Sequence, residues 1–305
     1  MLLFPAHRHL VSGSTFKILE RQAVGYEIKP IPGALGGEVV GLDLKAPLLA
    51  PDVSTVMRAL ANKIVLVFRN QNLTAPQLFA AAQQLGKPAA QSLTQYQAPD
   101  CPMVSYVSNQ ERTEEGAPKL LGKAWHTDHS FQAKPPMATM LHAVALPKHG
   151  SDTWFANMRL AYDELSSTMK NRLRGLKAVH AYRESREIMT RAERSVELSS
   201  EAEGNVNGVL HPVVRHHDEN GSKAIYINPL RIKCFIGMDA DDSAKLLGAL
   251  TAHATRDAFI YRHVWRPGDV VLWDNRQALH RVEHNHDLSE KRLMLRVILE
   301  GDTPK

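Results

Sequence analysis

The second half of the chain is dominated by short apolar segments of the kind that form β-strands. Five of them read MATMLHAVAL, KAIYIN, AFIYRHVW, DVVLWDN and RLMLRVIL. They are rich in β-branched and aromatic residues and are bounded by turn-forming residues, which is typical of strands. Between the third and the fourth, the sequence RPGD indicates a turn and predicts a β-hairpin. A chain with this pattern is expected to build much of its core from sheet.

The first half adds two helices and two further strands. The segment PDVSTVMRALANK begins with Pro51 and repeats apolar residues such as Val56 and Leu60 at helical spacing. In LTAPQLFAAAQQLG, Thr74 is a typical N-cap and Gly86 a typical C-terminal stop. The segments GGEVVGLDL and IVLVFR are predicted strands. The fold class is therefore mixed α and β, with no internal repeat.

Composition excludes several classes of protein. The 305 residues, of which 44% are hydrophobic and 23% charged, suffice for a full globular core, and no linker divides them. The net charge is +5, because Lys and Arg outnumber Asp and Glu. These basic residues are scattered along the chain, so we expect no nucleic-acid partner. The apolar runs are too short for a signal peptide or a membrane span. Two distant cysteines predict reduced thiols. We expect a cytoplasmic homo-oligomer with no membrane partner.

Two long polar stretches interrupt these patterns. They read VSNQERTEEGAPKLLG and EIMTRAERSVELSSEAEGNVNG. Loops of this length in a compact domain are surface decoration in most proteins and lids over active sites in some. The sequence alone leaves both interpretations open.

The stretch KAWHTDHSF contains a candidate metal site. On a strand, His126 and Asp128 would project from the same face, with Thr127 turned away. Among the 15 histidines of the chain, His280 is the favoured third ligand because it directly follows the predicted strand DVVLWDN. Two histidines and one carboxylate suit non-haem Fe(II) and leave three coordination positions open. The same three ligands would also serve a zinc-dependent hydrolase.

The last predicted strand carries two arginines on one face. In RLMLRVIL, Arg292 and Arg296 alternate with the aliphatic residues, so both point to the same side. At about 3.3 Å per residue, their Cα atoms lie roughly 13 Å apart and can serve two ends of one cavity. Arginine forms bidentate, charge-assisted hydrogen bonds with carboxylates, which suits an anion-binding role. A half-exposed strand with solvated arginines is the alternative.

Five segments of the chain together resemble a known family. In order, they read WHTDHSF, GSDTWFANM, HPVVRHHDENGSKAIYIN, RPGDVVLWDNRQALH and KRLMLRVILEGD. This order and spacing resemble the taurine and phenoxyacetate dioxygenases, which depend on Fe(II) and 2-oxoglutarate and use O₂. The resemblance implies a double-stranded β-helix, or jelly-roll, core with flanking helices. It runs over nearly the whole chain, so we expect one dioxygenase domain at residues 26–303 and an N-terminal extension at residues 1–25.

The resemblance also implies roles for individual residues. It assigns the iron to His126, Asp128 and His280. It assigns the far carboxylate of 2-oxoglutarate to Thr153 and Arg292, and places Arg296 at the co-substrate or substrate end. The expected substrate contacts are His129, whose counterpart in the taurine enzyme offers a backbone N–H, together with Tyr96, Arg231 and Arg296. Tyr96 can equally lie on the surface, and for Arg231 a surface salt bridge is the favoured alternative.

The function implied is hydroxylation of a C–H bond in a small, anionic organic substrate, with release of succinate and CO₂. A sulfonate, a sulfate ester, an aryloxy acid or another carboxylate would fit. The histidine and asparagine that hold the sulfonate in the taurine enzyme have no counterpart in GKPAAQSLTQY or KLLGKAW, so specificity for taurine is not expected. Asp128 argues against a related halogenase, which lacks this carboxylate. A zinc-dependent hydrolase and a non-catalytic jelly-roll binding protein are the alternatives.

Overall fold

The computed structural model describes residues 25–90, 94–110, 120, 122–182 and 208–305. The expected N-terminal extension lies outside these ranges apart from Gly25, as do most of the second polar stretch and half of the first. Both cysteines are free thiols, as the sequence predicted. In the parts of the chain that are described, every helix is too short or too polar to span a lipid bilayer.

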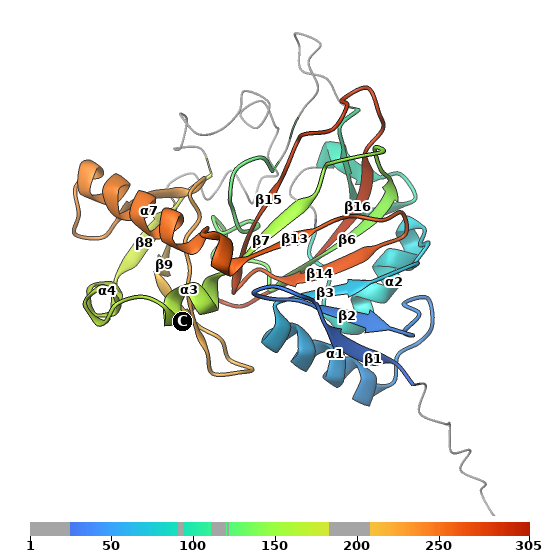
Figure 1. The fold of residues 1–305 in the computed structure, drawn as a ribbon, viewed down its shortest axis with the longest axis horizontal. Helices are drawn as coiled ribbons and strands as arrows, with labels where there is room; N and C mark the ends of the chain where they lie inside the picture. The colour runs from blue at the N-terminus through green and yellow to red at the C-terminus, as the bar shows by residue number, and fades with distance from the viewer. Residues whose placement is uncertain (1–24, 91–93, 111–119, 121, 183–207) are drawn as a thin grey trace, which may run out of the picture.

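An eight-stranded sheet forms one wall of the molecule (Figure 1). In spatial order it contains β1 (Glu27–Pro30), β2 (Gly37–Val40), β3 (Val65–Phe68), β14 (Val270–Asp274), β6 (Ala138–Ala145), β16 (Leu293–Leu299), β5 (Cys101–Ser108) and β4 (Gln97–Ala98). All neighbouring pairs are antiparallel except β2 and β3. Strands that are distant in sequence therefore lie side by side at the centre of the sheet.

A three-stranded antiparallel sheet packs against this wall. Its strands are β13 (Ile260–His263), β7 (Thr153–Asn157) and β15 (Ala278–Val282), in that order. Phe155 of this sheet shares one buried cluster with Leu141 and Val271 of the large sheet. Two facing antiparallel sheets joined by crossing connections form the jelly-roll core that the resemblance implied.

The prediction of a β-hairpin at RPGD is wrong. Strand β13 pairs with β7, whereas β14 pairs with β3 and β6, so the turn carries the chain from one sheet to the other. Buried Asp269 holds this turn, because its carboxylate accepts from the Arg266 backbone N–H at 2.8 Å and pairs with Arg69. Such a crossing cannot be told from a hairpin by the turn sequence, because the partners of each strand are distant in sequence.

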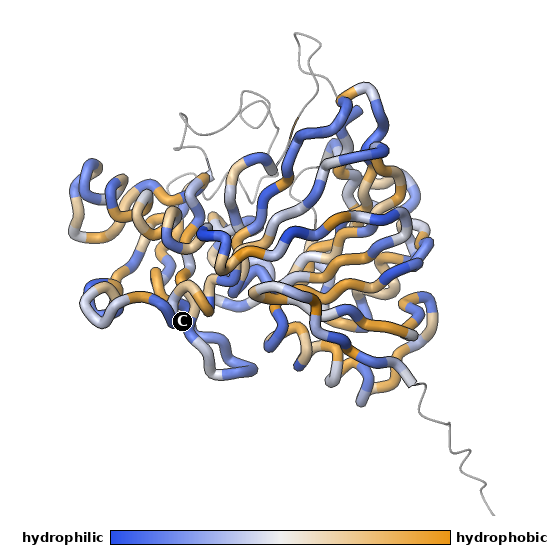
Figure 2. Tube along the Cα trace, viewed as in Figure 1, coloured by the Kyte–Doolittle hydropathy of each residue, from blue (hydrophilic) through white to orange (hydrophobic). Residues whose placement is uncertain are grey.

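Two helices cover the large sheet, and both were predicted. They are α1 (Ala50–Lys63) and α2 (Ala75–Leu85), which share a buried cluster with β3, β14 and β16. Thr74 caps α2 in a capping box with Gln77, and Gly86 follows its end. Figure 2 shows the hydrophobic residues concentrated along these strands and along parts of the helices. Each of the five strand-like segments of the second half contains a strand.

Of the remaining elements, only β11 was predicted, and all but η1 pack at the other end of the core. The helices are α3 (Met158–Asp163), α4 (Ser167–Leu173) and α7 (Ala240–Ala254), and the 3-10 turns are η1 (Thr94–Tyr96) and η2 (Asp257–Phe259). One three-stranded sheet contains β12 (Ile232–Phe235), β8 (Lys177–His180) and β9 (Val209–Pro212), and β10 (Val214–His216) pairs with β11 (Lys223–Ile225). Apolar side chains of α3, α7, β11 and β12 form one buried cluster.

Candidate active site

A cavity of about 110 Å³ lies between the two sheets of the jelly roll. The large sheet contributes Leu141 and Arg296 to its lining, and the small sheet contributes Thr153 and His280. The cavity brings together seven residues that the sequence singled out, namely Tyr96, His126, Asp128, Thr153, His280, Arg292 and Arg296. Segments far apart in the chain thus meet in one polar pocket.

Two histidines and one aspartate converge at one end of this cavity. The ligand atoms of His126, Asp128 and His280 all lie within 4.8 Å of one another. The Oδ1 atom of Asp128 is 3.9 Å from Nε2 of His126 and 3.8 Å from Nε2 of His280. Three donor atoms this close can share one metal ion. This is the only such group of three among the described residues.

The backbone around these residues differs in detail from the expected strand. His126 forms a one-residue antiparallel bridge with His280, with N–O distances of 3.0 and 2.8 Å, and Asp128 already lies in a turn. His280 belongs to β15, which begins four residues after β14 ends. The bridge fixes the two histidines opposite each other, so the triad depends on a contact between distant segments.

A chain of hydrogen bonds orients the aspartate. Its Oδ2 accepts from the Thr139 hydroxyl at 2.6 Å, and Thr139 Oγ1 accepts from Asn275 Nδ2 at 2.9 Å. Asn275 Oδ1 in turn accepts from the Trp273 indole at 2.9 Å. These bonds leave Oδ1 of Asp128 to face the histidines. Trp273 and Asn275 thus pack and hydrogen-bond beneath the site, and Trp273 also lines the cavity.

The protonation states of the triad suit metal binding. His126 places Nδ1 at 2.9 Å from the Ala124 carbonyl, which leaves Nε2 as the free donor atom. Burial lowers the pKa of His280 to about 3, and nearby His126 acts in the same direction. Burial alone would raise the pKa of Asp128, but His280, Arg296 and His126 outweigh it and hold this pKa below its usual range. A neutral imidazole and an ionised carboxylate are the forms that bind a metal.

Arg292, which also lines the cavity, is a buried cation. It is 3% exposed, and its Nε and Nη2 atoms have no hydrogen-bond partner among the described residues. Burial lowers the pKa of Arg292 to about 10, and no carboxylate of the described residues offsets this. A buried guanidinium without a partner is costly, so the pocket is built for an anion. Thr153, whose hydroxyl accepts from the Trp265 indole at 3.0 Å, lines the same cavity.

Arg296 lies nearer to the triad than Arg292 does. Its charge lowers the pKa of Asp128, whereas Arg292 has no comparable effect on that carboxylate. Its Nε atom is buried and has no hydrogen-bond partner among the described residues. Both arginines therefore face one cavity, Arg296 from β16 and Arg292 from the residue before it, as the alternation predicted.

Two of the expected substrate residues lie beside the cavity rather than in its lining. His129 is half-buried and has a left-handed backbone with φ of 44°. Its ring centroid lies 5.5 Å from that of Phe131, with the two rings tilted. Arg231 packs over the Tyr182 ring at 4.7 Å and donates to the Tyr182 carbonyl at 3.2 Å. Tyr96, in contrast, is buried and forms part of the wall.

Several lining residues were not recognised in the sequence. They are Tyr106, Val107, Gly122, Leu141 and Val282. Tyr106 and Val107 belong to β5, which was missed because Pro102 and two serines break its apolar pattern. The run MVSYV was the available signal, since valine and tyrosine favour strands.

A jelly roll that holds two histidines, a carboxylate and an unpaired buried arginine in one cavity defines the class of non-haem iron oxygenases. Residues 27–298 match the family model described as "Taurine catabolism dioxygenase TauD, TfdA family". The chain belongs to this family of Fe(II)- and 2-oxoglutarate-dependent dioxygenases, which use O₂ as co-substrate. The family predicted from the five segments is therefore confirmed.

The chain is similar to characterised members over most of its length. It is 33% identical to the alpha-ketoglutarate-dependent 2,4-dichlorophenoxyacetate dioxygenase of Burkholderia sp. (strain RASC), over 87% of this chain and 91% of the relative. It is 30% identical to the alpha-ketoglutarate-dependent sulfate ester dioxygenase of Pseudomonas putida, over 92% of both chains. The structure of AAD-2 with Mn(II) and N-oxalylglycine aligns with a TM-score of 0.77 and 30% identity, over 92% of this chain and 99% of that one.

Proposed function

We propose that the protein hydroxylates a C–H bond of a small organic anion, coupled to conversion of 2-oxoglutarate to succinate and CO₂. The observation that carries this proposal is the pair Arg292 and Arg296, which face the cavity beside the triad and form no ion pair with another described residue. Two separate anionic groups, one on the co-substrate and one on the substrate, would satisfy them.

His126, Asp128 and His280 would hold Fe(II) through Nε2, a carboxylate oxygen and Nε2. When bound with 2-oxoglutarate and O₂, the iron supplies the oxidant that an unactivated C–H bond requires. The hydrogen bond from Thr139 keeps the carboxylate oriented, and the bridge between the two histidines holds them opposite each other, where both could ligate one ion.

Arg292 and Thr153 would hold the far carboxylate of 2-oxoglutarate. The planar fork of arginine forms two parallel hydrogen bonds to a carboxylate, which lysine cannot reproduce. Arg292 is buried and its Nε and Nη2 are unpaired, so a carboxylate there offsets a cost that the protein already bears. Thr153 adds a hydroxyl that the Trp265 indole orients.

Arg296 would select an anionic substrate. It lies toward the triad, and Tyr96 and Trp273 supply aromatic surface in the same cavity. Arg296 is half-buried with its Nε buried, and a guanidinium in such a pocket discriminates against neutral analogues, which would leave it unpaired. The names of two relatives specify a carboxylate and sulfate esters. His129 and Arg231, beside the cavity, are proposed to contact the substrate. If the hydroxylated carbon bears a heteroatom, the product collapses to a carbonyl compound and a leaving group.

The assembly of the protein belongs to the same proposal. We propose one domain over residues 26–303 and a homo-oligomer in the cytoplasm. The match over residues 27–298 supports the domain boundaries. Size-exclusion chromatography with light scattering tests the oligomeric state.

The test measures succinate formation with a panel of sulfonates, sulfate esters, aryloxy acids, amino acids and neutral analogues, under Fe(II), 2-oxoglutarate and O₂. The variants His126→Ala, Asp128→Ala and His280→Ala should each lose turnover and Fe(II) binding. His284→Ala, a half-buried neighbour on the loop after β15, should keep both. A fully active His280→Ala variant contradicts the iron site. Turnover with Zn(II) in the absence of 2-oxoglutarate would instead identify a hydrolase, and binding of panel compounds without any succinate would indicate a binding protein.

A further inference from the structure

One residue outside the cavity lining fixes the backbone around Arg292. Asn109 is 3% exposed and follows the end of β5. Its Oδ1 accepts from the Arg292 backbone N–H at 2.9 Å, and its Nδ2 donates to the Glu290 carbonyl at 2.8 Å. Its own backbone N–H donates to the Arg292 carbonyl at 3.3 Å. Asn109 therefore holds the chain on both sides of the Arg292 Cα atom.

These bonds matter because the sheet itself does not extend to Arg292. The pairing of β16 with β5 ends at Leu293 opposite Ser108, one residue short of the arginine. On the outer side of the loop, Glu290 is held by Lys148, whose backbone N–H donates to its carboxylate at 2.7 Å. The Asn109 side chain thus takes the place of the next β16–β5 backbone hydrogen bond at Arg292.

The bonds of Asn109 also determine the state of His286. Since Oδ1 faces an N–H and Nδ2 faces a carbonyl, the amide cannot be flipped. Nδ2 lies 3.4 Å from Nε2 of His286 and can only donate, so this contact favours the neutral tautomer in which Nε2 accepts and Nδ1 carries the proton. His286 is only 8% exposed.

The electrostatic surroundings of His286 agree with this assignment. Burial lowers its pKa, and the charge of Arg292 acts in the same direction, while Glu290 and Asp287 oppose them. His284, whose ring centroid lies 6.0 Å away, is the other titratable group of this loop in contact with it. A neutral ring beside Asn109 supports the amide and adds no positive charge next to the arginine.

We infer that Asn109, supported by neutral His286, is a positioning residue for Arg292 and so for the far carboxylate of 2-oxoglutarate. The inference rests on the proposed function, which makes Arg292 the anchor of that carboxylate. Asn109 touches neither the metal ligands nor the reacting atoms. Its loss should weaken the co-substrate through the placement of the guanidinium and should leave the metal end of the cavity intact.

The experiment titrates the Mn(II)-loaded protein by calorimetry with two ligands. One is 2-oxoglutarate, and the other is 2-oxobutanoate, which has the same 2-oxo acid end but lacks the far carboxylate. Asn109→Ala should weaken 2-oxoglutarate about tenfold or more, as expected when a charged hydrogen bond is misplaced. It should leave 2-oxobutanoate unchanged. In turnover, KM for 2-oxoglutarate should rise by a similar factor while kcat at saturation is retained.

His286 supplies a second, independent arm of the test. His286→Ala should weaken 2-oxoglutarate selectively, and His286→Gln should restore much of the affinity, because its Oε1 can accept from Asn109 Nδ2. His284→Gln, on the same loop, is the matched control and should behave as the wild type with both ligands. If Asn109→Ala does not fold, as judged by circular dichroism, the comparison of His286→Ala with His286→Gln decides the question.

The outcomes separate this inference from the proposed function. If Arg292→Lys binds 2-oxoglutarate as tightly as the wild type, the anchor lies elsewhere and the proposed role of Arg292 fails. If Arg292→Lys weakens binding but Asn109→Ala does not, the anchor stands and the positioning role is overturned. Equal weakening of both ligands in Asn109→Ala would show a general structural effect, which also overturns it.

Discussion

At the scale of single residues, the site is defined by which buried polar groups have partners within the protein. The carboxylate of Asp128 is held by Thr139 and faces two histidines, so it is ready to ligate. Arg292 is equally buried, yet no carboxylate of the described residues pairs with it. A buried polar side chain with a hydrogen-bond partner, such as Asp128, is held in a fixed orientation. A buried polar side chain without one, such as Arg292, indicates where a ligand would bind.

Arg292→Lys tests the anchor directly. Lysine keeps the charge but loses the planar fork, so we expect the 2-oxoglutarate requirement to rise by one to two orders of magnitude, in the range of a lost charged hydrogen bond. Thr153→Val should raise it less, because only one neutral hydroxyl is removed. The absorbance of the anaerobic complex with Fe(II) and 2-oxoglutarate reports the affinity. An unchanged titration in Arg292→Lys would move the anchor to Arg296.

Arg296→Gln tests the charge of the substrate. Glutamine is polar but shorter and uncharged, so it should lower kcat/KM for anionic compounds by roughly 10²-fold or more, and much less for neutral ones. Succinate release is measured across the panel with 2-oxoglutarate saturating. The anionic-substrate reading fails if a neutral compound is the best substrate of the wild type. It also fails if the variant loses 2-oxoglutarate affinity while keeping its preference among anions.

Sequence reasoning found the polar residues of the site more easily than its walls. His126, Asp128 and His280 stand in a recognisable pattern because coordination chemistry restricts which side chains can serve. Tyr106 and Leu141 line the cavity only because β5 and β6 flank β16, and nothing local to either residue indicates this. Asn109 was missed for the same reason, since its partners lie about 180 positions away.

At the scale of elements, most local signals were read correctly, whereas the partners of the strands were not. Helices α1 and α2 were predicted because caps, proline and glycine act within one turn of the helix ends. The RPGD turn was misassigned because the same turn can close a hairpin or join two sheets. Helix α7 was overlooked although Asp239 caps it and Leu246 and Leu250 line its buried face, so its signal was present.

Thr74→Ala tests the best-defined helix start. The Thr74 hydroxyl accepts from the Gln77 N–H, and the Gln77 side chain accepts from the Thr74 N–H at 2.9 Å. Removing the hydroxyl leaves a helix-end donor unsatisfied and should cost about 1 kcal/mol of unfolding free energy. Thr168→Ala, at an exposed position inside α4, is the control and should cost little. Urea denaturation measures both, and equal midpoints in the two variants would contradict the capping role.

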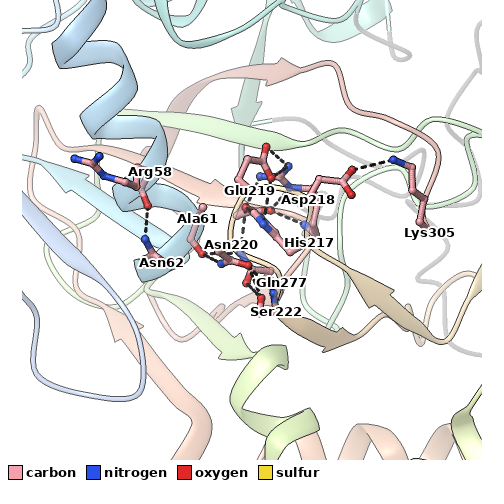
Figure 3. Close-up of polar contacts among 12 residues, drawn as sticks. Arg58, Ala61, Asn62, His217, Asp218, Glu219, Asn220, Ser222, Gln277 and Lys305 are labelled. Carbon is pink, nitrogen blue, oxygen red and sulfur yellow. Dashed lines mark hydrogen bonds and ion pairs between the residues drawn. The ribbon is translucent and has the colours of Figure 1, made fainter.

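At the scale of the whole molecule, partly buried polar networks join the parts of the fold. In one of them, the residues after β10 connect β14, α1 and the chain end (Figure 3). His217 lies 2.9 Å from the Asp274 carboxylate, Asn220 donates to the Ala61 carbonyl at 2.6 Å, and Lys305 pairs with Asp218 at 3.3 Å. Arg276 binds both Asp274 and Glu219. This network lies at the end of β14, the strand that precedes His280 in the chain.

Networks of this kind make the stability of the protein depend on pH. Burial would raise the pKa of Asp274, but Arg276 and His217 outweigh it, so its pKa in the folded state is depressed. Its contribution to stability is therefore present above its unfolded pKa near 4 and is lost as the pH falls below that value. The buried histidines act at higher pH, because their unfolded pKa is near 6.5.

His180→Phe should flatten the acid side of the stability profile. His180 and His211 lie ring to ring at 5.1 Å in the core, and burial lowers the pKa of His180 well below its usual value and that of His211 to about 4. Below pH 6.5, His180 is protonated in the unfolded chain but stays neutral in the folded core. Each such histidine should therefore lower the unfolding free energy by about 1.4 kcal/mol for every unit by which the pH falls. Above that pH its contribution should be constant.

Urea midpoints of the metal-free protein at pH 7.5, 6.0 and 5.0 measure the slope of the unfolding free energy against pH. His180→Phe should reduce this slope by the amount that corresponds to about one proton. Exposed His149→Gln is the control and should leave the slope unchanged. An equal slope in His180→Phe and the wild type would show that His180 is protonated in the folded core.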